Sequence, residues 1–404
     1  MGTSLDSTVQ FLEQLVSNPT STLPDVLAKD QLRKRLLLAI QKLVPELETP
    51  EEACQRILYN LLQKGLETPA ARIAVDLNIF NNLKESPTPL TTDQLAEKSG
   101  KDPDRKLLTR ILRYLASLGM VREVDTGLWA ASHFGNNLSG TGQSAGVASI
   151  VDNCSVAMVN LPAFLRLHAY KPPDTKSDTA FALGNRVSPE EATFFDWLKS
   201  RPENARHFNV FMGSHRTGTR TWLDRQDVID EITSALKKVT AGKPGGEEKG
   251  VSFVDIGGGI GHQCKAFKKR VPGLKGTIIL EDLEEVVEHA ELEPGIEKIG
   301  VNFLEGQPVK DWPDRYSRTI LSHVREAMDK DSLILIDELV LPDRGAHKYE
   351  TQLDLAMLAM LNAEARTETH WKQLLAEVGM EVKDIVFYEE ETREGIIIAK
   401  KVSS

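Results

Sequence analysis

The chain has 404 residues, of which 41% are hydrophobic and 27% are charged, and its formal net charge at pH 7 is −10. This composition is typical of a soluble globular protein with two domains, and the acidic balance disfavours a nucleic-acid partner. No apolar run approaches the roughly 20 residues of a membrane span, and the N-terminus lacks the pattern of a secretory signal. The three cysteines form no CxxC pair, so we expect no metal site and a cytoplasmic, reducing compartment.

The first part of the chain is predicted to be helical. Residues 30–44 and 50–64 place apolar side chains at intervals of three and four residues. Thr49 stands before Pro50 as an N-cap residue would. These helices carry more leucine and isoleucine than a small domain can bury, which predicts a homodimer interface.

A further helix is predicted over residues 72–84, followed by a helix-turn-helix at 91–99 and 102–118. The turn at Asp125–Gly127 then joins two short strands into a hairpin-like wing. Such a winged helix either binds DNA or serves as a packing and dimerisation module. The net acidity favours the second interpretation.

Residues 190–213 form an aromatic helical segment whose large side chains belong to a core, although some could line an apolar pocket between domains. We expect a helical dimerisation domain over residues 1–135 and a helical linker lining the substrate cleft over 136–235. A cofactor-binding domain follows over residues 236–404.

A strand, a glycine-rich turn and a helix follow one another from Val251 to Val271. The strand ends at Asp255, and a second strand ends at Asp282, about 27 residues later. In α/β proteins this arrangement brings backbone N–H groups to a nucleotide-like ligand, and the later carboxylate grips a ribose diol. The turn glycines allow a positive φ and leave room for the ligand; they are Gly257, Gly258, Gly259 and Gly261.

From residue 251 onward strands alternate with helices, which predicts a doubly wound parallel sheet closed by an antiparallel pair at 381–388 and 395–400. The strongest strand, 332–340, carries Asp337 and Glu338 near its carboxyl end, where ligands bind in such sheets.

Several short motifs occur in a fixed order along the chain. They are VDIGGGIG at 254–261, Glu281-Asp282-Leu283, Asn302-Phe303, Asp311-Trp312, LIDE at 335–338 and ARTETHW at 365–371. In this order the chain resembles the cation-independent, S-adenosylmethionine (SAM)-dependent O-methyltransferases, most closely those of fungal secondary metabolism. The resemblance implies a Rossmann-like SAM-binding domain behind an all-α winged-helix dimerisation domain. It also implies a homodimer with a small-molecule substrate.

The resemblance assigns roles to individual residues. Gly257–Gly261 would pack against the methionine part of SAM, and Asp282 would bind the ribose hydroxyls. Asn302-Phe303 stands where the family commonly has an acidic residue near the adenine, and Trp312 would flank the adenine unless it is a core tryptophan.

Two departures from the family concern catalysis. The family has a histidine before the Asp-Trp pair that takes the substrate proton, whereas Pro308-Val309-Lys310 precedes Asp311 here. The central strand that should lead into this histidine is also missing. Ala365 replaces the glutamate that orients the histidine. Three explanations could each account for part of this pattern. They are an intron assignment that removed a few codons, a real loss of methyl transfer, and an inert relic.

Relatives known as leporin-type pericyclases keep SAM as a fixed positive charge and catalyse dehydration and cycloaddition of polyketide–amino-acid pyridones. His133 and Arg366 are candidate hydrogen-bond donors for such a site, and Asp337 is a candidate polar contact. His133 could equally be a surface or structural histidine. We favour this non-methylating function; O-methylation of a phenol or enol and an inactive dimeric binding protein are the alternatives.

Overall fold

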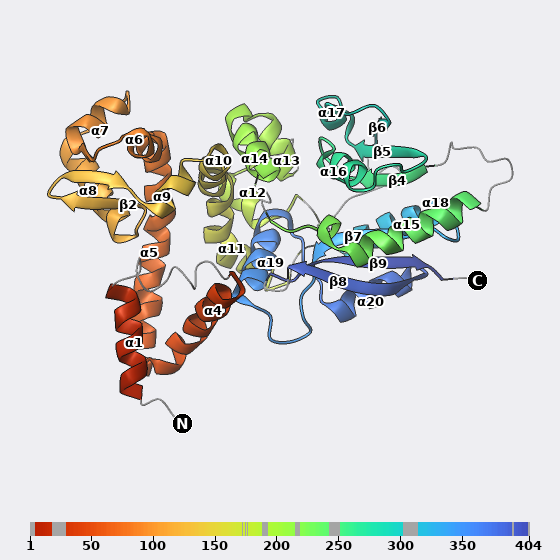
Figure 1. Ribbon diagram of the computed structural model, residues 1–404, viewed down its shortest axis with the longest axis horizontal. Coiled ribbons are helices and arrows are strands. Elements are labelled where there is room, and N and C mark those ends of the chain that lie inside the picture. The colour runs from red at the N-terminus through yellow and green to blue at the C-terminus, as the bar shows by residue number, and fades with distance from the viewer. Residues whose placement is uncertain are drawn as a thin grey trace. The chain divides into compact units, whose positions relative to one another are not determined.

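The computed structural model describes residues 5–17, 30–171, 173, 175, 177–187, 193–214, 219–241, 251–301, 314–389 and 392–402. The chain divides into two compact units, Met1–Ala71 and Arg72–Ser404. Figure 1 shows the order of the elements along the chain. The domain limits at residues 135 and 235 stay predictions.

The first unit is helical, as predicted. Its helices are α1 (Leu5–Ser17), α4 (Asp30–Leu47) and the greater part of α5 (Pro50–Asp76). Thr49 caps α5 reciprocally, because its Oγ1 accepts from Glu52 N–H at 3.2 Å while its own N–H donates to Glu52 Oε2 at 2.9 Å. The helix continues past Pro69 to Asp76, so the separate helix predicted at 72–84 is wrong. The helical run breaks at Asn78, which has a left-handed φ of 53° and is the N-cap residue of α6 (Ile79–Glu85).

The predicted helix-turn-helix and its wing are confirmed in the second unit. A capping box between Thr91 and Gln94 fixes the start of the first helix, and the longer helix buries three leucines against it. Strand order β1-β3-β2 adds a small antiparallel sheet to this helical region. The elements are β1 (Leu90–Thr91), α7 (Thr92–Lys98), α8 (Arg105–Ser117), β2 (Val121–Asp125) and β3 (Leu128–Ala131).

The middle of the chain is a run of helices with an aromatic core. Phe181 contacts Phe194 and Trp197 edge-on, with ring centroids 5.2 Å apart in both pairs. Phe195 and Met212, counted with the aromatic core segment from sequence, are exposed. The elements are α9 (His133–Leu138), α10 (Thr141–Ser149), η1 (Ile150–Cys154), α11 (Ser155–Leu167), α12 (Ala180–Asn185), α13 (Phe194–Lys199) and α14 (Pro202–Ser214).

The helical run from Thr141 to Leu167 is, by length and composition, apolar enough to cross a membrane. The charges of Asp152 and Arg166 interrupt it, and Ala148, Ala157 and Phe164 are buried inside the protein. A core helix of a soluble protein passes the same test, so this helix is weak evidence for a membrane partner.

The first sheet of the C-terminal half is parallel, with strand order β4-β5-β6. Strand β4 carries the apolar run before the glycine turn, and the weak strand predicted around residues 297–301 is present as β6. The elements are η2 (Trp222–Asp224), α15 (Gln226–Ala241), β4 (Val251–Ile256), α16 (His262–Arg270), β5 (Thr277–Asp282), α17 (Glu284–Val287) and β6 (Ile296–Gly300).

The second sheet is antiparallel, with strand order β7-β9-β8. The predicted closing pair is confirmed as β8 and β9, and β7 is the strong strand predicted at 332–340. The elements are α18 (Asp314–Ala327), β7 (Ile334–Leu339), α19 (Lys348–Leu361), α20 (Glu368–Glu377), β8 (Met380–Glu389) and β9 (Glu394–Lys401).

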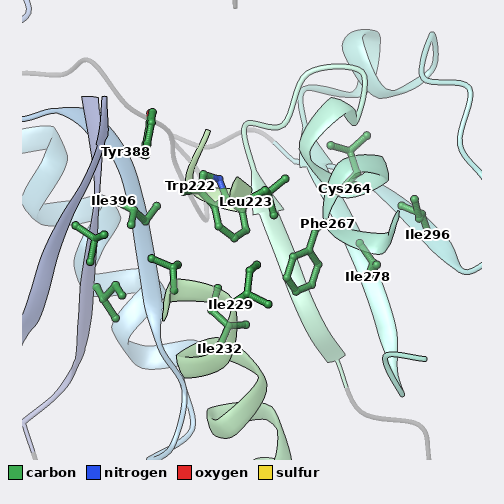
Figure 2. Close-up of a cluster of buried hydrophobic side chains, with 14 of the residues drawn as sticks. Trp222, Leu223, Ile229, Ile232, Cys264, Phe267, Ile278, Ile296, Tyr388 and Ile396 are labelled. Carbon is green, nitrogen blue, oxygen red and sulfur yellow. The ribbon is translucent and has the colours of Figure 1, made fainter. Parts of the chain in front are cut away.

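The single doubly wound sheet expected from the sequence is therefore divided into two sheets of three strands within the described chain. A shared cluster of buried side chains joins them: Trp222, Ile229 and Ile232 pack with residues of both sheets, as Figure 2 shows. The division falls at the position of the strand whose absence the sequence predicts.

Candidate functional site

The glycine turn after β4 is shaped by backbone conformations that only glycine adopts easily. Gly257, Gly259 and Gly261 have φ angles of 70°, 59° and 82°. A Cβ atom on Gly258 would lie 2.4 Å from Asp255 Oδ2 and 2.5 Å from Leu280 Cδ1. A Cβ atom on Gly259 would meet nothing within 4 Å. The turn is thus packed against its own sheet at Gly258 and open at Gly259.

Asp282 lies at the carboxyl end of β5 and bonds the turn directly. Its Oδ2 accepts from the Gly259 N–H at 2.7 Å, and its Oδ1 accepts from the Leu283 N–H at 2.7 Å. A carboxylate has about four lone-pair positions, so each oxygen can accept one hydrogen bond more. A diol could therefore bind here without displacing the turn.

Asp255 lies on the inner side of the turn. Cys264, in the first turn of α16, directs its thiol toward Asp255 Oδ2 at 3.6 Å. Burial raises the pKa of the Cys264 thiol, and the Asp255 charge raises it further, so the thiol stays protonated and donates. The N–H groups of Gly257 and Gly258 donate to the Glu281 carbonyl at 2.7 and 3.2 Å, so the turn is tied to β5 and Asp282 supplies the acceptors that face a ligand.

A cleft of about 610 Å³ separates the two sheets. It is lined by all six residues of β4, Val251–Ile256, and by six successive residues of the β7 segment, Leu333–Glu338. Ile232 and Leu236 of α15 and Ile320, Leu321 and Val324 of α18 complete most of its apolar wall. Asp337 and Arg366, both predicted site residues, lie together in this lining.

Arg366 is 3% exposed and is held by several partners. Its Nε donates to Asp314 Oδ1 at 2.9 Å, and its Nη2 donates to Ser317 Oγ at 3.1 Å. His370 Nε2 is 2.9 Å from the other oxygen of Asp314. Asp314 therefore joins α18 to the loop before α20 through Arg366 and to α20 itself through His370.

The charges of this network shift two pKa values. Burial raises the pKa of Asp314, but the hydrogen bonds and positive charges of His370 and Arg366 outweigh it and lower that pKa to about 2. Burial raises the pKa of Glu364, the neighbouring Arg366 charge opposes the rise, and the Asp314 charge adds to it.

Asp314, Glu364 and His370 place three potential metal-ligand atoms within 4.8 Å of one another. The Arg366 guanidinium already bonds Asp314 and lies 3.8 Å from Glu364 Oε1. Because this cation balances the carboxylates, the cluster is an ion-pair network.

Asp337 lines the cleft and also forms a hydrogen bond within the second sheet. Its Oδ1 accepts from the Tyr388 hydroxyl of β8 at 2.5 Å, and the side chains of both residues are buried. This bond links the outer strands of the sheet across β9.

The other predicted residues are not brought to the cleft by the described structure. His133 is the exposed first residue of α9, behind the cap Ser132, and is outside the described cleft lining. Asn302, Phe303 and Trp312 lie outside the described residues, so their contacts with the adenine stay predictions.

Comparisons with known proteins agree with this architecture. Residues 248–381 match the O-methyltransferase domain model, and residues 60–139 match the O-methyltransferase dimerisation domain model. The O-methyltransferase ucdC of Aspergillus ustus is 32% identical over 93% of this chain and 96% of its own length. The chain belongs to the O-methyltransferase family.

The O-methyltransferase-family relatives include the O-methyltransferase lepI of Aspergillus flavus, which is 31% identical over 87% of this chain and 89% of its own length. The solved structure of LepI in complex with SAM superposes with a TM-score of 0.81 at 28% identity, covering 99% of this chain and 100% of LepI. A structure titled as a pericyclic reaction enzyme superposes with a TM-score of 0.79 at 27% identity, covering 98% and 99% of the two chains. This family member is therefore a SAM-dependent enzyme related to proteins of secondary metabolism.

The sequence interpretation did not assign roles to four residues of the site. Asp314 and His370 stand within the quoted or adjoining motifs, and their pairing depends on the approach of α18 to α20. Tyr388 is in a predicted strand, and its contact with Asp337 depends on strand register. Glu281 precedes Asp282, and strand alternation could have placed it on the face opposite Leu280.

Proposed function

We propose that this enzyme binds SAM and catalyses a dehydration or cycloaddition of a polyketide-type pyridone without transferring the methyl group. One observation carries the proposal: the glycine turn and Asp282 are in place at the end of the first sheet, while the described lining of the cleft includes no histidine, lysine or tyrosine. O-methylation needs a group that takes the hydroxyl proton, and imidazole titrates in the right range for this task.

In this proposal the glycine turn and Asp282 hold SAM beside the mouth of the cleft. When bound, SAM supplies a fixed positive charge that stabilises negative charge developing on a substrate in a pocket shielded from water. Arg366 adds a second fixed cation, which Asp314 and Ser317 hold in place. Asp337 offers an acceptor oriented by Tyr388.

O-methylation of a phenol or enol is the second candidate function. The curated relatives named as O-methyltransferases support it, because they match nearly the whole chain. In that case a carboxylate of the cleft, such as Glu281, would have to take the hydroxyl proton. Burial raises the pKa of Glu281, which makes it a stronger base than an ordinary carboxylate.

Incubation with methyl-labelled SAM and a panel of pyridone and phenol substrates tests the proposal. We expect rearranged or dehydrated product, dependence of the rate on SAM, and label that stays in SAM. Labelled product with an equal amount of S-adenosylhomocysteine would contradict the proposal and support O-methylation. Bound SAM without turnover of any substrate would favour an inactive binding protein.

We also propose that the enzyme is a homodimer. The matched dimerisation domain begins inside α5, and apolar side chains on the preceding helices are solvent-exposed in the single chain, including Leu43 and Leu47 of α4 and Leu58 of α5. A second copy would cover them. Light scattering should give twice the chain mass for the wild type and for the control Glu46→Gln. It should give a shift toward the single-chain mass for the double variant Leu43→Glu, Leu47→Glu; an unshifted mass would contradict this interface.

A reducing cytoplasmic compartment stays part of the proposal. All three cysteines are free, and burial raises the pKa of Cys154 to about 11, so that thiol is unreactive at neutral pH.

A further inference from the structure

We infer that the cleft between β4 and β7 receives one additional β-strand, contributed by residues that the functional chain carries between Val301 and Asp314. This inference concerns the sheet: a strand that fills the space between β4 and β7 leaves the carboxyl ends of these strands, near Asp255 and Asp337, for a substrate of either proposed chemistry. It bears on the proposed function because the added residues could include a base.

The lining of the cleft indicates the edges of two strands. A cavity over the face of a strand is lined by alternate residues, because successive side chains point to opposite faces. Here six successive residues of β4, Val251–Ile256, and six successive residues, Leu333–Glu338, line one cavity. Among the described strands β4 pairs only with β5, and β7 pairs only with β9, so each has one edge without a strand partner.

Helices cover both faces of the cleft, as they do over a central strand of an α/β sheet. Leu333 and Leu335 pack on the cluster that contains Ile232 of α15. The alternate residues Ile334 and Ile336 pack on the cluster that contains Leu321 of α18. Residues of both helices also line the cleft itself.

The cleft is not packed as the interior of a folded protein is. At about 610 Å³ it exceeds the volume of about 20 water molecules, whereas cores contain few voids larger than one. Val251 and Val254 of β4 are 52% and 37% exposed, although their strand is apolar. Two buried polar atoms of the lining, Glu281 Oε2 and Trp371 Nε1, have no hydrogen-bond partner in the described chain.

Connectivity determines where the strand would enter the chain. Helix α18 packs against β7 residues and leads into β7 within a few residues. A strand immediately before α18 would form a strand–helix–strand crossover with β7, which places the two strands side by side and parallel. The twelve residues 302–313, NFLEGQPVKDWP, contain no apolar run of strand length. The strand therefore requires additional residues, about ten for five or six paired positions and their turns.

Sequencing of the messenger RNA across the codons for Val301–Asp314 tests the inference. We expect about ten additional codons, mostly for apolar residues. A message that joins these codons as in the 404-residue chain would overturn the inference and leave the proposed function standing. Additional codons that include a histidine before Asp311 would support the inference and overturn the non-methylating function. Additional codons without a new base would support both.

Hydrogen exchange of the purified protein is the second test. In the longer chain the amides of β4 and β7 should exchange at least 100-fold more slowly than in the 404-residue chain. The matched control is the 404-residue chain with a Gly/Ser segment of equal length inserted after Lys310, which lengthens the connection without filling the cleft. Equal exchange in the longer chain and in this control would overturn the inference. Protection that rises with protein concentration would indicate a strand from a second copy and would also overturn it.

Discussion

The two sheets of the C-terminal half differ in where their polar side chains find partners. At the end of the β4-β5-β6 sheet, Asp282 bonds backbone N–H groups and keeps lone pairs for a ligand. At the end of the β7-β9-β8 sheet, Asp337 and Arg366 bond side chains of their own half. The first sheet leaves carboxylate acceptors open to a small molecule, whereas these polar groups of the second half bond within the protein.

Under the proposed function, this difference would let the chain keep a cofactor site without methyl transfer. The cofactor site would depend on β4, β5 and the turn after β4. Strand β4 pairs with β5 although the cleft lies beside β4. The reacting groups of a substrate would depend on the region between the sheets, where the cleft lies. Variants in the first sheet should therefore change SAM affinity, and variants in the second should change stability.

The largest effect is expected for Gly258→Ala. The new methyl group would lie 2.4 Å from Asp255 Oδ2 and 2.5 Å from Leu280 Cδ1, so the turn must move. We expect SAM affinity measured by calorimetry to fall at least 100-fold, about 2.7 kcal/mol. Gly65→Ala is the matched control, because its Cβ meets nothing within 4 Å and Gly65 lies inside a helix. Unchanged affinity in Gly258→Ala would contradict the role of the turn.

Asp282→Ala should weaken SAM binding about 30-fold, about 2 kcal/mol, since it removes the ribose acceptor and the bond to Gly259. Glu288→Gln, an exposed carboxylate shortly after it in the chain, should leave the affinity unchanged. The loss should appear mainly in the SAM affinity and only weakly in the thermal midpoint of the protein. Equal affinity in the two variants would exclude Asp282 from the cofactor site.

Asp314→Asn should lower the free energy of unfolding by about 1.5 kcal/mol, because it removes the carboxylate charge that bonds the buried Arg366 cation. The control Glu326→Gln changes an exposed carboxylate of the same helix. Denaturant titration measures both, and SAM affinity should stay the same. A stable Asp314→Asn protein with weakened SAM binding would reverse the assignment of the two sheets.

The pH dependence of stability follows from the same carboxylate. The pKa of Asp314 is about 2 in the folded protein, below its ordinary value of 3.8. A lowered folded pKa stabilises the protein above the unfolded pKa, and this contribution is lost as the pH falls from about 4 to about 2. Asp314→Asn should lack this part of the acid limb, whereas Glu326→Gln should retain it. Identical acid limbs would contradict the ion-pair network.

The smallest effect is expected for Tyr388→Phe, which removes the hydroxyl bond to Asp337. We expect a loss of about 1 kcal/mol in unfolding free energy and no change in SAM affinity. Tyr170→Phe, at an exposed tyrosine, is the control and should change neither quantity. A larger effect on SAM affinity than on stability would place Asp337 with the cofactor.

The sequence predicts the local parts of this fold well. The winged helix, the glycine turn and the strands β7 to β9 carry their signals in residue spacing, and Thr49 and Thr91 mark helix starts through local hydrogen bonds. The continuation of α5 past residue 64 was missed because Pro69 and Gly65 usually end helices.

The arrangement of the site is less accessible from sequence. Asp314 and His370 are 56 residues apart, and only the packing of α18 against α20 brings them together. The bond from Tyr388 to Asp337 depends on the register of three antiparallel strands. The resemblance assigns Asp282 and the glycines to the cofactor, which stays a prediction, whereas the cleft depends on the strand partners of β4 and β7, which are not encoded locally.

The most direct test of the contrast between the two sheets is hydrogen exchange of the 404-residue chain with and without saturating SAM. The account predicts slower exchange in the turn Gly257–Gly261 and at Asp282–Leu283, with the amides of β7 unchanged. Protection centred on β7 and the Arg366 loop, or no protection anywhere at saturating SAM, would contradict it.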